Sequence, residues 1–241
     1  MCFTVNVNLV KEELENRYGA TLLDPDKYRP SYYYHAFGLP RLPVIASDSP
    51  AEIKMMTWGL IPSWVRSSKD AEEIRLKTFN ARSDSVDTKP SFSGSFSSKR
   101  CIVPVRGFFE WQHTSSGKIP WYIYRADNDI MSLAGLWAKW TDSSTGDSLS
   151  TFSIITTDAN RLMSEIHNSK KRMPVVIEKE SESEWLSQDT DVLKLKQFLQ
   201  PYPEIILQAH TISDLINRQN AERNTPELIR QFNRAPENLI F

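Results

Sequence analysis

The sequence has little cysteine, few glycines and no long hydrophobic run. Its 2 cysteines in 241 residues are too few for a disulfide framework or a four-thiolate zinc site. The 8 glycines and 14 prolines follow no triplet repeat, which excludes a collagen-like chain. We expect no transmembrane helix, no secretory signal and no membrane partner, because no apolar stretch approaches the length that either segment needs. A cytoplasmic, reducing environment is therefore expected, with nucleoid association if the source is bacterial.

The sequence also has almost no net charge, because its positive and negative residues nearly balance. The chain has 29 Lys and Arg against 30 Asp and Glu, which gives a formal net charge of −1. Proteins that grip long stretches of nucleic acid by charge usually carry a clear basic excess. Any nucleic-acid site here must therefore be a local patch of limited length. The 40% hydrophobic and 24% charged residues are typical of a folded globular chain.

Strand-like segments dominate the middle of the chain, and helical patterns lie mainly toward its ends. β-branched and aromatic residues predict these strands: Val5–Val7, Ile53–Leu60, Cys101–Val105, Pro120–Tyr124, Met131–Trp140, Thr151–Thr157, Met173–Ile177 and Ile205–His210. Helices are expected over these ranges: Leu9–Tyr18, Asp70–Lys77, Ala159–His167, Ser181–Leu186 and Asp191–Leu199. The elements do not alternate as βαβ units. We predict one α+β domain over residues 1–241, with a mainly antiparallel, curved or barrel-like sheet and flanking helices.

Two further expectations concern details of this pattern. The segment Asp24–Pro43 is rich in proline and tyrosine and has no period, so we interpret it as irregular and packed through its aromatic rings. Asp158 precedes the predicted helix that begins at Ala159 and is the expected N-cap of that helix.

Cys2 is the first candidate for chemistry. Removal of the initiator Met1, common when the next side chain is small, would make Cys2 the N-terminal residue. Its α-amine, with a reference pKa of about 7.7–8.0, would then lie beside a thiol. An aldehyde reacts with such a group first as an imine and then by ring closure to a five-membered thiazolidine. The alternative is a small buried hydrophobic residue, the usual role of a cysteine.

Glu110 and His167 are the candidate proton carriers. Glu110 lies in the run Gly107–Trp111 between aromatic residues, where desolvation would raise its pKa toward values useful for proton transfer. The alternative is a glutamate that points to solvent. His167 ends a predicted helix and precedes the cationic run Lys170–Arg172; helix-end electrostatics alone can also explain it. The other histidines have no comparable neighbourhood: His35, His113 and His210.

Asn80, Arg82 and Trp64 are candidates for DNA contact. Asn80 and Arg82 lie two residues apart and would share one face of a strand, where the guanidinium could bind phosphate; a turn is the alternative. Trp64, in the run Trp58–Trp64, could stack on a base or fill the core. Neither metal-ligand spacing nor a glycine-rich phosphate loop is present, so we expect no cofactor and no metal.

Taken in order, these motifs resemble the SRAP family of abasic-site processing proteins. The matching pieces are Met1-Cys2, Trp58-Gly59-Leu60-Ile61-Pro62-x-Trp64, Asn80-Ala81-Arg82-Ser83-Asp84, Gly107-Phe108-Phe109-Glu110-Trp111 and His167 followed by Arg172-Met173-Pro174. The resemblance implies an α+β domain around a distorted β-barrel. It also implies covalent shielding of abasic sites in single-stranded DNA through the N-terminal cysteine. A monomer is expected.

The resemblance gives each residue a role. Cys2 would form the thiazolidine crosslink, Glu110 would move protons, Asn80 would hold the N-terminal residue and the sugar, and His167 would act as a general acid or bind phosphate. Contacts with DNA are implied for Arg82, Arg172, Trp64, Met173 and Pro174.

The sequence departs from the family pattern in three places. Phe3 and Thr4 replace the usual Gly-Arg, Tyr32–Phe37 replaces a Tyr-Asn-x-x-Pro stretch, and Ser169–Lys171 lengthens the link between His167 and Arg-Met-Pro.

Two other functions stay open at this point. A cysteine-nucleophile peptidase or amidohydrolase would use Cys2 with its own amine or His167 as base, and the family's self-removal of Met1 overlaps with it. A non-covalent single-strand binder would use Trp64, Arg82 and Arg172.

Overall fold

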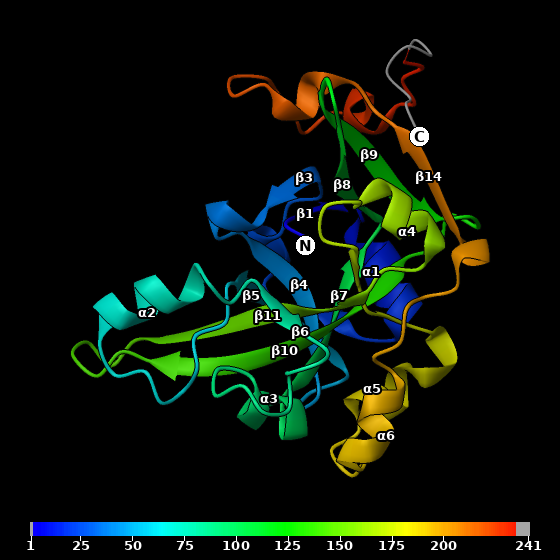
Figure 1. Ribbon diagram of the computed structural model, residues 1–241. Helices are drawn as coiled ribbons and strands as arrows, with labels where there is room; N and C mark the ends of the chain where they lie inside the picture. The colour runs from blue at the N-terminus through cyan, green and yellow to red at the C-terminus, as the bar shows by residue number, and fades with distance from the viewer. Residues whose placement is uncertain (1, 235–241) are drawn as a thin grey trace.

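The computed structural model describes residues 2–234, and strands form most of its framework (Figure 1). The strands are β1 (Thr4–Val7), β2 (Thr21–Leu22), β3 (Ser31–His35), β4 (Arg41–Ala46), β5 (Glu52–Trp58), β6 (Asn80–Arg82), β7 (Arg100–Val105), β8 (Gly107–Thr114), β9 (Gly117–Arg125), β10 (Met131–Thr141), β11 (Ser148–Asp158), β12 (Arg172–Pro174), β13 (Val176–Ile177) and β14 (Leu207–Thr211). They form a 5-stranded and a 9-stranded sheet. Most pairs are antiparallel, which confirms the predicted α+β class.

The larger sheet closes on itself into a barrel. Its order runs β12-β11-β10-β7-β4-β5-β2, and an additional pairing joins β11 back to β5. That closing pair is parallel, with Thr151 opposite Thr57 and Phe152 opposite Trp58. The two aromatic rings at the closure stack with centroids 5.9 Å apart. Apolar side chains fill the ring; every residue of β7 is buried.

The smaller sheet carries the start of the chain in its interior. Its order is β14-β9-β8-β1-β3, so β1 hydrogen-bonds to β3 on one side and to β8 on the other. Val5 lies opposite Phe108 in β8 and opposite Tyr34 in β3. All four residues of β1 are buried. The strand therefore anchors Cys2 and Phe3, which precede it, against the middle of the fold.

Short helices surround the sheets. They are α1 (Lys11–Tyr18), α2 (Ser68–Arg75), α3 (Ser93–Ser98), α4 (Arg161–Ile166), α5 (Glu182–Leu186) and α6 (Val192–Gln197), with 3₁₀ turns η1 (Pro25–Lys27), η2 (Ala36–Gly38), η3 (Lys179–Ser181), η4 (Glu204–Ile206), η5 (Asp214–Asn217) and η6 (Pro226–Ile229). Gly19 ends α1 in a left-handed conformation, with φ of 60°, as the sequence predicts for a helix-terminating glycine. Figure 1 shows α4 beside β8, and the two elements are in contact.

Three sequence-based expectations need correction. The segment Asp24–Pro43 is not irregular throughout, because it contains β3 and the start of β4; a tyrosine-rich run suits a half-buried strand. The N-cap of α4 is Asn160, whose side chain accepts from the Met163 amide, rather than Asp158. The strand expected over Met173–Ile177 is broken into β12 and β13.

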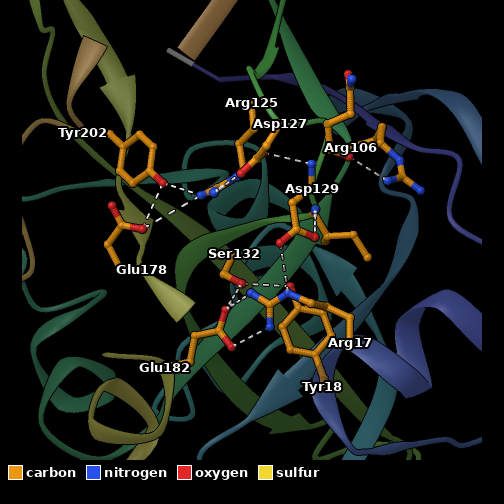
Figure 2. Close-up of polar contacts among 12 residues, drawn as sticks. Arg17, Tyr18, Arg106, Arg125, Asp127, Asp129, Ser132, Glu178, Glu182 and Tyr202 are labelled. Carbon is orange, nitrogen blue, oxygen red and sulfur yellow. Dashed lines mark hydrogen bonds and ion pairs between the residues drawn. The ribbon is translucent and has the colours of Figure 1, made fainter. Parts of the chain in front are cut away.

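An ionic network ties the helices to the smaller and larger sheets (Figure 2). Arg17 in α1 donates to both carboxylate oxygens of Glu182 in α5, at 3.0 and 2.6 Å. Ser132 in β10 donates to the same carboxylate. A second group joins Arg125 to Asp127 and to the Tyr202 hydroxyl. These contacts hold α5 against α1 and β10, and they hold the segment that contains Tyr202 against the end of β9.

No helix within residues 2–234 is both long enough and apolar enough to span a bilayer. The same residues hold no cluster of three or more His, Cys, Asp or Glu side chains placed to bind a metal ion.

Candidate active site

The structure brings Cys2 and Asn80 together from distant parts of the sequence. The Asn80 side-chain amide donates to the Cys2 carbonyl at 3.0 Å. Asn80 begins β6, which lies parallel to β11 with Asn80 opposite Ile154. The carbonyl of the preceding Phe79 accepts from the Trp58 indole at 2.9 Å. The barrel therefore fixes Asn80 firmly, and Asn80 in turn fixes the backbone of Cys2.

Glu110 is a buried carboxyl in β8, and its burial shifts its pKa toward neutral pH. It is 4% exposed and lies opposite Trp121 in β9. Burial raises the pKa of the Glu110 carboxyl from 4.5 to about 7, because a charged carboxylate is poorly solvated there. A carboxyl with this pKa exchanges protons readily at neutral pH.

The Cys2 thiol lies within the electrostatic field of Glu110. Its side chain is buried, at 0% exposure. Burial, and secondarily the negative charge of Glu110, raise the pKa of the Cys2 thiol above its ordinary value. The thiol is therefore a neutral S–H in this form of the chain, in which residue 1 still precedes it.

His167 completes the buried group. It follows α4 and is 6% exposed, and its Nε2 lies 3.8 Å from Glu110 Oε2. Burial lowers the pKa of the His167 ring from 6.5 to about 4, so the ring is neutral at pH 7. Its Nδ1 lies 2.9 Å from the Arg172 carbonyl. That oxygen only accepts, so Nδ1 carries the proton and Nε2 presents a lone pair toward Glu110.

A pocket of about 620 Å³ opens from this group to the surface. Glu110 and His167 form part of its wall, and Phe3, the neighbour of Cys2, forms another part. The remaining lining residues are Trp111, His113, Lys118, Ser169, Lys170 and Asn217. The pocket therefore provides a path for a ligand to within one residue of Cys2.

The two predicted phosphate-binding arginines differ in their accessibility. Arg82 has a half-exposed side chain and pairs with Asp84. The guanidinium of Arg172 is buried: it donates to the Thr156 carbonyl at 2.6 Å and lies 3.6 Å from Asp158. Arg82 is the arginine with a surface that phosphate can reach. Arg172 acts on the site through its carbonyl, which fixes the His167 ring.

The three other residues predicted to contact DNA also divide by exposure. Trp64 is 57% exposed and its indole donates to the Pro90 carbonyl at 3.3 Å, so one ring surface is available for stacking. Met173 and Pro174 were expected at the DNA, but β12 buries both side chains. They pair with β11, Met173 opposite Thr157, and leave no surface for a base or phosphate. The pairing of β12 with β11 fixes the position of the turn before β12, which contains His167.

Sequence reasoning missed several residues that line the pocket. His113 lies in no recognisable functional motif of the sequence, yet it lines the wall of the pocket together with Lys118 and Asn217. The hairpin that joins β8 to β9 brings His113 opposite Lys118. Asn217 comes from the distant η5. No local sequence pattern links η5 to β8, so only the three-dimensional structure reveals this wall.

Comparisons with known proteins show which family the chain belongs to. The abasic site processing protein YoqW of Bacillus subtilis is 38% identical over 86% of this chain and 88% of its own length. The abasic site processing protein HMCES of Xenopus tropicalis is 33% identical over 85% of this chain and 67% of its own length. A crystal structure of a protein from Bacteroides thetaiotaomicron superposes with a TM-score of 0.90 at 38% identity, covering 96% of this chain and 100% of that one. Residues 1–219 match the family described as SOS response associated peptidase (SRAP). The chain belongs to the SRAP family.

Proposed function

We propose that this protein processes abasic sites in single-stranded DNA by forming a covalent thiazolidine through Cys2 after Met1 is removed. The observation that carries the proposal is the convergence of Cys2, Asn80 and Glu110. Asn80 holds the Cys2 carbonyl at 3.0 Å, and Glu110, with a pKa of about 7, acts electrostatically on the Cys2 thiol. Relatives that carry the name abasic site processing protein support the choice of substrate.

The chemistry requires an amine and a thiol on one residue. Once Met1 is removed, the Cys2 nitrogen is a primary amine that attacks C1 of the ring-opened abasic sugar. The carbinolamine loses one water to give an imine. The sulfur then adds to the imine carbon, and the thiol proton ends on nitrogen, which closes the five-membered ring. The net change is loss of one water, with no oxidant or reductant.

Glu110 is suited to move the protons in these steps. The amine must lose a proton on attack, and the carbinolamine hydroxyl must gain one to leave as water. A carboxyl with a pKa of about 7 is populated in both forms at neutral pH, the condition under which one group serves as base and then as acid. The same group would reverse the reaction.

His167 acts as a proton acceptor rather than as the general acid that the resemblance suggested. Its neutral ring has its single proton on Nδ1, where the Arg172 carbonyl holds it. Nε2 therefore accepts a proton or hydrogen bond on the side that faces Glu110. We assign it the role of accepting a hydrogen bond either from the protonated form of Glu110 or from the sugar.

Single-stranded DNA fits the distribution of charge. The net charge of −1 rules against a long electrostatic grip, so the strand would be held by a few contacts near the lesion. Arg82 for phosphate and Trp64 for a base are the exposed candidates. The covalent bond to Cys2 would then keep the DNA strand attached to the protein.

A denaturing gel tests the proposal directly. Protein whose N-terminal residue is verified as Cys2 by intact mass is incubated with a single-stranded oligonucleotide that carries one abasic site. Wild-type protein should give a shifted, heat-stable band, and Cys2→Ala should give none. Cys101→Ala, which removes the other buried cysteine, is the matched control and should retain the band. Absence of a band for the wild type would refute the proposal.

The amine requirement provides a second, sharper test. A variant with an extra residue retained before Cys2 keeps the thiol but lacks the primary amine at that position, so it should form no thiazolidine. A heat-stable crosslink from the extended protein would rule out the mechanism.

Self-removal of Met1 belongs to the same proposal. The buried, neutral Cys2 thiol argues against a general cysteine hydrolase, which needs an accessible thiolate, and favours a reaction confined to the chain's own N-terminus. Protein is made without methionine aminopeptidase, and the intact masses of wild type, Glu110→Gln and Cys2→Ala are compared. Retention of Met1 in the variants alone supports self-processing. Identical processing contradicts it.

A further inference from the structure

We propose that the pocket beside Glu110 is a nucleotide subsite, which takes the intact nucleotide next to the abasic sugar. Its base would lie against Trp111, and its phosphate would lie between Lys118 and Lys170. The inference rests on the proposed function, because it assigns the neighbour of the reacting sugar.

Two separate chain segments form the rim of the pocket and are fastened to each other. Asn168, in the segment after α4, accepts from the His113 amide at 3.0 Å and donates to the His113 carbonyl at 2.8 Å. His113 lies directly opposite Lys118 across the hairpin. The paired hydrogen bonds of Asn168 therefore hold the segment that carries Lys170 against the strand pair that carries Lys118.

Lys118 and Lys170 bring two positive charges to the rim of the pocket. Both side chains are exposed, and both line the pocket. Within residues 2–234, neither lysine forms an ion pair with a carboxylate. A phosphate that bridges the two ammonium groups would supply the missing negative charge, and exposed lysine is an effective point-charge partner for phosphate.

Trp111 offers a fixed aromatic surface in the same pocket. Its indole nitrogen donates to the Asn217 side-chain oxygen at 2.9 Å, which restrains the ring. The ring is partly exposed and lines the pocket. A restrained aromatic ring can stack on any base, independent of sequence. A protein that acts wherever a base has been lost requires such a sequence-independent contact.

The size of the pocket agrees with such a ligand. Its volume of about 620 Å³ lies within the range of 300–1,000 Å³ typical of sites for small organic ligands. Glu110 and His167 lie on its inner wall, so a nucleotide seated there would place its neighbouring sugar at the proton-transfer group. The pocket thus sets the register of the strand relative to Cys2.

The first test changes the DNA, so the fold of the protein is not disturbed. Crosslinking rates are measured against DNA concentration for oligonucleotides in which the nucleotide 5′ or 3′ of the abasic site is replaced by tetrahydrofuran, which keeps the phosphate but lacks a base and the reactive aldehyde. Base removal on one side should raise the half-saturating concentration about 5-fold or more. An unchanged half-saturating concentration for both substrates would overturn the subsite.

The second test pairs this change with the aromatic ring. In Trp111→Leu, the half-saturating concentration for intact DNA should rise to that of wild type with the base-free neighbour. Removing the base should then cause no further loss. Full additivity of the two changes would place the base elsewhere and overturn the assignment of Trp111.

The third test concerns the phosphate. Lys118→Gln and Lys170→Gln should each raise the half-saturating concentration by about 3- to 10-fold and lower its salt dependence, with the maximal rate unchanged. Lys139→Gln, an exposed lysine of β10, makes the same charge change away from the pocket and should behave as wild type. Equal behaviour of all three variants would overturn the phosphate contact. A wild type that gives no crosslink at all would instead refute the proposed function.

Discussion

Replacing Glu110 with glutamine should reveal a pH dependence of folding stability that His167 conceals in the wild-type protein. The two groups are buried side by side and their pKa values are shifted in opposite directions, upward for Glu110 and downward for His167. Each shift makes the free energy of unfolding depend on pH, because the folded and unfolded states then bind different numbers of protons. The two dependences have opposite signs.

Glu110 stabilises the folded state less as the pH rises. Its carboxyl has an ordinary pKa of 4.5 and a folded pKa of about 7, so between these values the folded state keeps a proton that the unfolded state has released. The contribution of Glu110 to the free energy of unfolding is therefore largest below pH 4.5, and it falls as the pH rises until the pH passes 7. At about 1.4 kcal/mol per pKa unit, the loss amounts to about 3 kcal/mol.

His167 has the reverse effect. Its ring has an ordinary pKa of 6.5 and a folded pKa of about 4, so between these values the unfolded state holds the extra proton. Stability is present above pH 6.5 and is lost as the pH falls toward 4. Allowing for solvent screening, the loss amounts to about 2 kcal/mol.

Between pH 4.5 and 6.5 the two effects oppose each other and the contribution of the pair is nearly flat. Glu110→Gln removes one of them, so its stability relative to wild type should increase as pH rises from 4.5 to 7. His167→Asn should show the opposite trend, and the double variant should again be nearly flat. Urea unfolding at half-unit pH steps from 4.5 to 8, with intact mass used to match the N-terminal residue, measures these differences.

The result that refutes this reasoning is simple to recognise. If the free energy of unfolding of Glu110→Gln runs parallel to wild type over the whole range, Glu110 has an ordinary pKa in the folded protein. The proposed proton-transfer role would then lose its physical basis. Parallel behaviour of His167→Asn would show the same for the neutral ring.

Three further predictions concern positioning and stability. Asn80→Ala removes the contact to the Cys2 carbonyl and should slow crosslinking about tenfold through misplacement of the reacting residue, while urea unfolding changes little. Gly107→Ala introduces a Cβ 2.5 Å from a tyrosine ring and should lower the free energy of unfolding by about 1–3 kcal/mol; a loss under 0.5 kcal/mol would contradict the packing. Glu182→Ala removes the close carboxylate partner of the nearly buried Arg17, which then keeps only the longer 3.9 Å contact with Asp129, and should cost about 2 kcal/mol, whereas Glu182→Gln should recover part of the loss.

The sequence predicted the fold class and most strands because alternation and β-branched enrichment act locally. The αL end of α1 at Gly19 is equally local. The closure of the barrel was not predictable in this way. It depends on a parallel pairing between β5 and β11, near residues 57 and 151, and nothing in either segment alone specifies the other.

The candidate site shows the same division. Cys2, Asn80, Glu110 and His167 were identified from their residue types and motifs, and the structure gathers these four around one buried point. The orientation of His167 could not be predicted, since it depends on a carbonyl acceptor five residues later.

The pocket wall was likewise beyond sequence reasoning. Trp111 and Asn217 are joined by a hydrogen bond across 106 positions, and no spacing rule relates them. Burial of Met173 and Pro174 follows from the pairing of β12 with β11, which is also a long-range property.

The interior position of β1 has a consequence for the timing of biosynthesis. Its partners are residues 31–35 and 107–108, so β1 waits for about 100 further residues before its second neighbour exists. At about 5–20 residues per second, the ribosome needs roughly 5–20 seconds to supply them. During that interval the start of the chain is open to aminopeptidases, and afterwards Cys2 is buried. Trimming by external enzymes is therefore easiest during synthesis, before Cys2 and β1 are buried.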